Sequence, residues 1–129
     1  MPIYDETEET YLHVGTELAK RQIAYVHLND DRTNGVPVIS DAFLAKFRAV
    51  FTGTLILAGG MEKDRAERLD QENLIDLAAF GQPFISNPDL VERMRNGWPL
   101  QRPDRETYYG GHSAGYTDYP NYQSTELVS

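Results

Sequence analysis

The sequence predicts an α/β protein in which about three parallel strands alternate with helices. Short runs of β-branched, aromatic or aliphatic residues lie at 23–28, 54–58 and 77–80, and the segments around them carry apolar residues at helical spacing. The run at 54–58 is apolar without alternation, which is typical of a strand covered by helices on both faces. Elements that alternate in this order build a parallel sheet with right-handed crossovers.

The first third of the chain supplies a helix, a strand and a loop. The first helix is expected because Asp5 and Glu8 have the spacing of a capping box, and apolar residues then recur at helical intervals. The strand at 23–28 follows this helix. A polar loop over 29–37 then leads to the next element.

The middle of the chain supplies two further helices. Ser40 and Asp41 can cap the first of them, and its apolar residues form one buried stripe. The members of that stripe are Phe43, Leu44, Phe47, Val50 and Phe51. The strand at 54–58 follows, and a weaker helix at 62–71 turns abundant charge outward.

The last helix is defined by its ends. Asn87 is expected to be its N-cap, with Pro88 at the first helical position, and Gly97 is expected to stop it. From Trp98 the chain has no periodicity, and five of its eight tyrosines lie between residues 108 and 122. Clustered tyrosines combine flat apolar surface with a hydroxyl group, which suits contact with a ligand or a partner.

The composition excludes several classes of protein. With 20 acidic and 12 basic residues, the formal net charge is −8, which argues against a general nucleic-acid binder. No apolar run approaches the roughly 20 residues of a membrane span, and the acidic start is not a secretory signal. We therefore expect a soluble, cytoplasmic protein without membrane contact. The chain has no cysteine, which excludes disulfides and thiolate metal sites.

No metal site is expected from the remaining ligand types. His13, His27 and His112 do not have metal-ligand spacing. His27 lies in an apolar strand and is expected to be a core residue. The neighbouring pair Asp30 and Asp31 lies in the polar loop and is expected to be solvated.

Glycines follow two of the predicted strands, Gly59 and Gly60 after 54–58 and Gly81 after 77–80. Backbone N–H groups at the carboxyl ends of parallel strands favour anions, and glycine lets the backbone approach a phosphate closely. The alternative, that these glycines only make tight turns between strand and helix, stays open. The sequence contains neither a dinucleotide-binding nor a Walker-type glycine loop.

Three stretches of the chain resemble the C-terminal end of the old yellow enzymes. They are 79–93, which contains Asn-Pro-Asp-Leu, 108–111, which reads Tyr-Tyr-Gly-Gly, and 115–120, which reads Gly-Tyr-Thr-Asp-Tyr-Pro. The resemblance implies an FMN-dependent (β/α)8 TIM barrel that reduces activated alkenes with NAD(P)H, passing hydride through the flavin. Residues 1–129 would be a partial FMN-binding barrel domain, with the last three β/α units at 5–97 and a C-terminal tail at 98–129.

The resemblance also assigns four residues to the FMN phosphate. The backbone N–H groups of Gly59 and Gly60 would hold it, and Gly81 and Gln82 would complete the site. Members of the family usually place arginine where this chain has Gln82. Arginine offers a fixed cation and a planar fork to phosphate, whereas glutamine offers one neutral amide.

The resemblance places substrate contacts, but no catalytic residue, in this chain. Tyr109, with Tyr108 beside it, matches the aromatic pair that lines the flavin and substrate, and the loop at 29–35 would border the substrate. The substrate-anchoring pair, the proton-donating tyrosine and the arginine near the flavin belong to the family's first five strands. The chain is therefore expected to be the last three-eighths of such a barrel, a truncated reading frame or a split product.

Two other functions compete with this interpretation. The chain could be a non-catalytic fragment that folds only with a complementary N-terminal barrel half or by self-association, because three parallel strands leave sheet edges and the barrel-interior face uncovered. An independent three-layer α/β binding module is the third alternative. Each of these interpretations expects the chain to bind small molecules or other protein chains.

Overall fold

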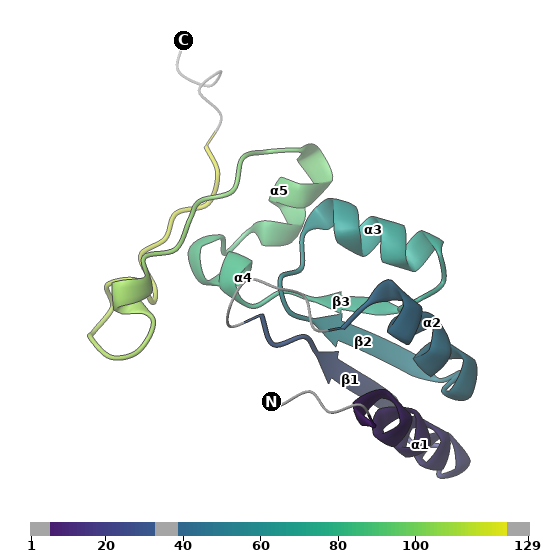
Figure 1. The fold of residues 1–129 in the computed structure, drawn as a ribbon. Helices are drawn as coiled ribbons and strands as arrows, with labels where there is room; N and C mark the ends of the chain where they lie inside the picture. Colours follow the sequence, from purple (N-terminus) through teal and green to yellow (C-terminus); the bar gives the residue numbers. More distant parts are fainter. Residues whose placement is uncertain (1–5, 33–38, 124–129) are drawn as a thin grey trace. The chain divides into compact units, whose positions relative to one another are not determined.

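The computed structural model describes residues 6–32 and 39–123. Its elements follow the predicted order (Figure 1). The helices are α1 (Thr7–Lys20), α2 (Asp41–Val50), α3 (Lys63–Gln71), α4 (Gln82–Ser86) and α5 (Leu90–Asn96), and the strands are β1 (Tyr25–Asn29), β2 (Thr54–Ala58) and β3 (Leu77–Ala79). A 3-10 helix, η1, spans Arg105–Thr107. The chain forms two compact units, Met1–Phe80 and Gly81–Ser129.

The strands form one parallel sheet in the order β1-β2-β3, which confirms the predicted class. β2 has the predicted bounds, whereas β1 begins two residues later than expected, at Tyr25, and β3 ends one residue earlier. Asn29 lies opposite Ala58, and Ala58 lies opposite Ala79. The strands therefore end in register, and the turns that follow β1 and β2 are neighbours at the carboxyl edge of the sheet.

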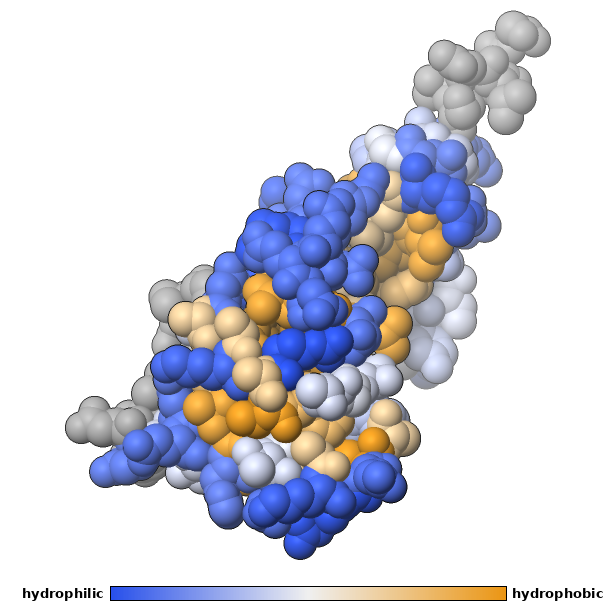
Figure 2. All heavy atoms as spheres, turned by 90° about the vertical axis from the view of Figure 1, so that its right-hand side faces the viewer, coloured by the Kyte–Doolittle hydropathy of each residue, from blue (hydrophilic) through white to orange (hydrophobic). Residues whose placement is uncertain are grey.

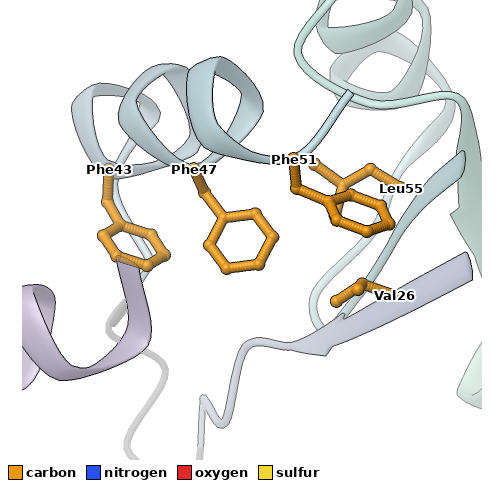
Figure 3. Packing of buried hydrophobic residues seen from close by; sticks show 5 residues of the cluster. All are labelled: Val26, Phe43, Phe47, Phe51 and Leu55. Atoms are coloured by element: carbon orange, nitrogen blue, oxygen red, sulfur yellow. The ribbon is translucent and has the colours of Figure 1, made fainter. Parts of the chain in front are cut away.

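Aromatic residues of the second helix make the first half of the core. Phe43, Phe47 and Phe51 project from one side of α2 and its C-terminal end, and they form one cluster with Val26 of β1 and Leu55 of β2 (Figure 3). All five are buried, and the centroids of successive rings lie 6.0 and 6.2 Å apart. Tilted ring contacts of this kind add to the free energy gained from apolar burial.

A second cluster packs α2 and α3 over β2. Its members are at most 5% exposed, and they are Leu44, Leu57, Met61, Leu69 and Ile75. The predicted stripe of α2 is confirmed at four of its five positions, and Val50 is half-buried. Ser40 caps α2 as expected, because its Oγ accepts a hydrogen bond from the backbone N–H of Phe43 at 3.1 Å. Asp5 lies outside the described residues.

The expectation that β2 is covered on both faces is wrong. Burial alternates along the strand, so that Leu55 and Leu57 are buried while Ile56 is half-buried. On the same face as Ile56, Tyr25 is 56% exposed and Leu77 is 54% exposed. Within the first unit, helices pack on one face of the sheet, and the second face, with Tyr25, Ile56 and Leu77, is less covered. In the view of Figure 2, apolar residues also reach the surface between hydrophilic ones.

Two sequence-based assignments in the sheet and its loop are also wrong. His27 is exposed rather than in the core, because it points to the uncovered face together with Ile56 of β2. Asp30 is buried rather than solvated, with 2% of its surface exposed. Both errors have one cause, since each side chain's environment is set by strands and helices distant in sequence.

Asn87 is not the N-cap of the last helix. The predicted start falls between two helices, the five-residue α4 and α5, which begins at Leu90. The Asn87 side chain instead bonds to the segment that follows α5, as described below. Gly97 does end α5, with a left-handed φ of 68°.

At the amino edge of the sheet, opposite the carboxyl edge, an ion pair between Arg48 and Asp76 joins α2, β2 and the segment that precedes β3. Arg48 of α2 donates from Nη1 and Nη2 to the Asp76 carboxylate at 2.7 and 2.9 Å. That carboxylate also accepts from the backbone N–H of Leu55 at 2.8 Å. The hydrogen bonds from Arg48 and Leu55 lower the pKa of Asp76, since they favour its charged form.

Replacing this carboxylate should make the first unit less stable and less sensitive to acid. We expect Asp76→Asn to lower the free energy of unfolding by about 1 kcal/mol at neutral pH, a modest value because the pair is partly exposed. The pKa of Asp76 is lowered on folding, so its contribution is present above the unfolded value of about 3.9 and lost as the pH falls below it. Urea unfolding at neutral and acidic pH measures this, with Asp70→Asn as the control. Equal losses in the two variants would contradict the expectation.

Candidate functional site

The turn between β2 and α3 consists of two glycines in the left-handed region. Gly59 has a φ of 105° and Gly60 a φ of 54°, conformations that glycine adopts without strain. A Cβ on Gly59 would lie 2.1 Å from the backbone oxygen of Asp30, and a Cβ on Gly60 would lie 2.5 Å from Cδ of Arg32. The fold therefore requires glycine at position 59, where backbone fills the space of a Cβ, and the left-handed φ favours glycine at position 60, as expected for a tight turn.

The same turn leaves two donors available. Within residues 6–32 and 39–123, the backbone N–H groups of Gly59 and Gly60 form no hydrogen bond to the protein. Gly60 is also exposed. Neighbouring N–H groups in a left-handed turn form a concave site that accepts an anion. The geometry thus fits a phosphate group as well as a tight turn.

Three charged side chains surround this turn. The Asp30 carboxylate accepts from Arg32 Nε at 3.2 Å and from the backbone N–H of Ile39 at 3.3 Å. Arg65 of α3 donates from Nη1 to the carbonyl oxygen of Gly59 at 3.1 Å, and its Nη2 lies 3.9 Å from the same carboxylate. We name Asp30, Arg32 and Arg65 the edge cluster.

Sequence reasoning missed both arginines of the edge cluster. Arg65 lies in a helix whose charges were assigned to the outward face, and Arg32 lies in a polar loop. The one available signal was position, because Arg32 closely follows the end of a strand, and ligand contacts collect at such ends. The polar loop over 29–37 is described only through Arg32, so the predicted substrate contacts of its later residues lie outside the described chain.

Gly81 and Gln82 form the start of α4 in the second unit. Gly81 precedes the helix with a φ of −98°, and a Cβ there would meet no atom within 4 Å. The backbone therefore does not require glycine at this position. Gln82 is the first helical residue and is exposed.

Tyr108 and Tyr109 lie beside η1 with their rings edge to face, 6.2 Å apart and at 79°. Tyr109 is 94% exposed, and Tyr108 is half-buried. A ring as exposed as this contributes little to the packing of the described chain. Tyr109 is therefore free to contact a ligand.

The segment that carries these tyrosines is fastened at its beginning by Asn87. The buried Asn87 amide donates to the carbonyl of Gln101 at 3.0 Å, and its oxygen accepts from the Gln101 N–H at 2.8 Å. The same amide donates to the Pro83 carbonyl at 2.8 Å. The Asn-Pro-Asp-Leu stretch thus has a structural role, since its asparagine binds α4 and the outgoing segment together.

An ion pair between buried Arg93 and half-buried Asp89 fastens the segment at its end. Arg93 donates to Asp89 at 2.7 Å and to the carbonyls of Pro99 and Pro120, both at 3.0 Å. The N–H of Tyr122 donates to the second oxygen of Asp89 at 2.8 Å. Burial opposes ionisation of Asp89, but these hydrogen bonds outweigh it, and the pKa of Asp89 is lowered. The outgoing and returning limbs of the tail are thereby held by one guanidinium.

Within the described residues, no group of three or more histidine, aspartate or glutamate side chains could hold a metal ion. Over those same residues, no helix is long and apolar enough to cross a membrane.

The sequence pattern of the NADH:flavin oxidoreductase / NADH oxidase family matches residues 5–101. The chain therefore belongs to this family. The resemblance to the old yellow enzymes is confirmed, and the sheet with its helices is part of a (β/α)8 barrel of their kind.

Individual relatives give the same result. A 12-oxophytodienoate reductase-like protein from Solanum lycopersicum is 36% identical over 115 residues, which cover 88% of this chain and 31% of that protein. The solved structure of morphinone reductase in complex with tetrahydroNAD is 40% identical, with a TM-score of 0.84 over 94% of this chain and 32% of the other. The old yellow enzyme from Trypanosoma cruzi is 35% identical, with a TM-score of 0.83 over 94% of this chain and 32% of that enzyme. The chain spans about a third of the length of these relatives.

The ion pair between Arg93 and Asp89 leads to a prediction about Trp98, the single tryptophan. Trp98 stacks on Tyr122 with ring centroids 4.6 Å apart, so it reports whether the returning limb is attached. We expect Arg93→Gln to raise acrylamide quenching of Trp98 toward the value of the urea-unfolded chain, because Asp89 and two carbonyls lose their donor. Arg95→Gln, on the same helix and exposed, is the control. Equal quenching in the two variants would show that Arg93 does not hold the tail.

Proposed function

We propose that this chain supplies the FMN-phosphate end of the site in an FMN-dependent ene-reductase, an enzyme that reduces activated alkenes with NADH or NADPH. The observation that carries the proposal is the turn at Gly59 and Gly60. Its two N–H groups, which form no hydrogen bond to the described part of the chain, lie at the carboxyl edge of a parallel sheet, next to guanidinium groups, in a chain of a flavin-dependent family. That is the chemistry a phosphate monoester requires.

Each assigned residue has a distinct part in this proposal. Gly59 and Gly60 would donate their N–H groups to phosphate oxygens, and Gly81 and Gln82 would add a neutral contact from the second unit. Tyr109 would lie against the substrate side of the flavin. Bound FMN would accept hydride from the nicotinamide and pass it to the alkene.

These contacts increase the affinity for FMN rather than the rate of alkene reduction. A phosphate remote from the reacting atoms is held equally in the ground state and the transition state, so its contacts do not lower the barrier. The groups that anchor an alkene and protonate it are not among the residues assigned here. We therefore propose that the 129 residues alone do not reduce alkenes.

One observation favours a second function, association with another protein chain. The less covered sheet face carries Tyr25 and Leu77, which are 56% and 54% exposed, and Ile56, which is half-buried. Apolar sheet faces of this kind pack against further structure. A complementary N-terminal barrel half or a second copy of the chain would provide this further structure. Either association would also be open to a fragment without catalytic activity.

Restoring the family's arginine should strengthen phosphate binding. We expect Gln82→Arg to tighten FMN binding about tenfold, because a charge-assisted, bidentate contact replaces a neutral one. Quenching of flavin fluorescence gives the affinity, and riboflavin, which lacks the phosphate, is the control ligand. An equal gain for riboflavin, or no gain for FMN, would mean that Gln82 does not face the phosphate.

Reconstitution tests the proposed activity. We expect no alkene reduction by the 129 residues with FMN, and turnover when they are mixed with the preceding part of the barrel taken from the Solanum lycopersicum relative. Anaerobic NADPH oxidation with N-ethylmaleimide measures this for each half and for the mixture. Turnover by the chain alone above that of free FMN, or none in a mixture that binds FMN, would contradict the proposal.

In an active mixture, Tyr109 can be tested separately. We expect Tyr109→Ala to lower turnover more than it weakens FMN binding, since its ring would contact substrate rather than phosphate. Tyr116→Ala is the matched control, because Tyr116 is an equally open tyrosine of the same tail, 83% exposed. The same loss in both variants would remove the assigned role of Tyr109.

A further inference from the structure

Arg32 lies directly against the turn that the proposed function assigns to phosphate. A Cβ on Gly60 would lie 2.7 Å from Nε and 2.8 Å from Nη1 of Arg32, so the guanidinium lies beside this glycine. Its Nε is used by Asp30, at 3.2 Å. Its two terminal nitrogens donate to no group of the described chain, and 23% of the side chain is exposed. Among the described residues, the terminal nitrogens of Arg32 and the N–H groups of the turn therefore lie side by side without a hydrogen-bond acceptor.

The edge cluster also carries an excess of positive charge, which favours an anion at the turn. Two guanidinium groups, those of Arg32 and Arg65, share the single buried carboxylate of Asp30. Burial and the neighbouring charge of Arg32 lower the pKa of Arg65, and the attraction of Asp30 and Asp41 does not compensate. An anion at the turn would relieve this repulsion, because it would add the negative charge that the cluster lacks.

We infer that Arg32 binds a phosphate monoester at the Gly59–Gly60 turn and supplies the cation that Gln82 does not. The identity of that phosphate as the one of FMN rests on the proposed function. Asp30 fixes Nε of Arg32, which leaves the outer edge of the planar guanidinium for two phosphate oxygens. Arg65 is a positioning residue, since it holds the Gly59 carbonyl and shares the Asp30 carboxylate.

The first test compares FMN with riboflavin on the full chain. The fluorescence of each flavin is titrated with the parent chain, Arg32→Gln, Arg32→Lys and the control Arg21→Gln, which removes an exposed charge at the end of α1. We expect Arg32→Gln to lose about tenfold or more of the FMN affinity while riboflavin affinity is unchanged. Arg32→Lys should lie between, because lysine keeps the charge without the fork. Arg21→Gln should match the parent.

The second test uses inorganic phosphate alone and reads the two turn amides. In amide-resolved nitrogen–proton NMR spectra of the full chain, we expect the Gly59 and Gly60 signals to shift on phosphate addition, and to remain unmoved in Arg32→Gln. The spectra also show that each variant is folded. If Arg32→Gln does not fold, Arg32→Lys replaces it in this test, since lysine retains a cation next to Asp30.

The outcomes separate the inference from the function on which it rests. A parent chain that prefers FMN, with the preference kept in Arg32→Gln, would overturn the role of Arg32 and leave the proposed function intact. Turn amides that shift with phosphate in an Arg32-dependent way, in a chain that does not prefer FMN, would uphold the anion site and overturn the flavin assignment. Turn amides that do not respond to phosphate or FMN would overturn the inference.

Discussion

The buried carboxylate of Asp30 holds together the edge of the sheet on which the site depends. The Asp30 N–H donates to Ala58 at 2.9 Å, and its carbonyl occupies the space that a Cβ of Gly59 would need. Its carboxylate accepts from the N–H of Ile39, just before α2, and from Arg32. One residue thus joins the ends of β1 and β2 and the approach to α2. A buried carboxylate without these partners would be strongly destabilising.

This arrangement also explains how a tight turn can be an anion site. The Asp30 carbonyl forces glycine at position 59 by filling the space beside it, and the left-handed turn leaves the N–H groups of Gly59 and Gly60 without a partner among the described residues. The structural and the functional interpretation of these glycines are therefore compatible. The second unit has its own constraint, since Asn87 and Arg93 tie the tyrosine-bearing tail to α4 and α5.

Local patterns predicted the elements well, and long-range partners explain what they missed. The bounds of β2 followed from its unbroken apolar run, and the inward positions of α2 followed from the spacing of its stripe, because both patterns are encoded by neighbouring residues. Asn87 was taken for a cap because its true partner, Gln101, is 14 residues away. Asp30 was taken for a solvated residue because the neighbouring loop residues do not show that its backbone pairs with Ala58, 28 positions further on, or that its carboxylate accepts from Ile39. The glycines of the site were predicted because they directly follow strands. The two arginines were not predicted, because no periodic pattern in a loop or on a charged helix face distinguishes a ligand-binding residue from a solvated one.

A crystal structure of the chain with FMN bound would test the phosphate assignment most directly. We predict phosphate oxygens within about 3 Å of the N–H groups of Gly59 and Gly60, with the outer edge of the Arg32 guanidinium on the same oxygens. A phosphate bound away from this turn, with both glycine N–H groups left to solvent, would contradict the account.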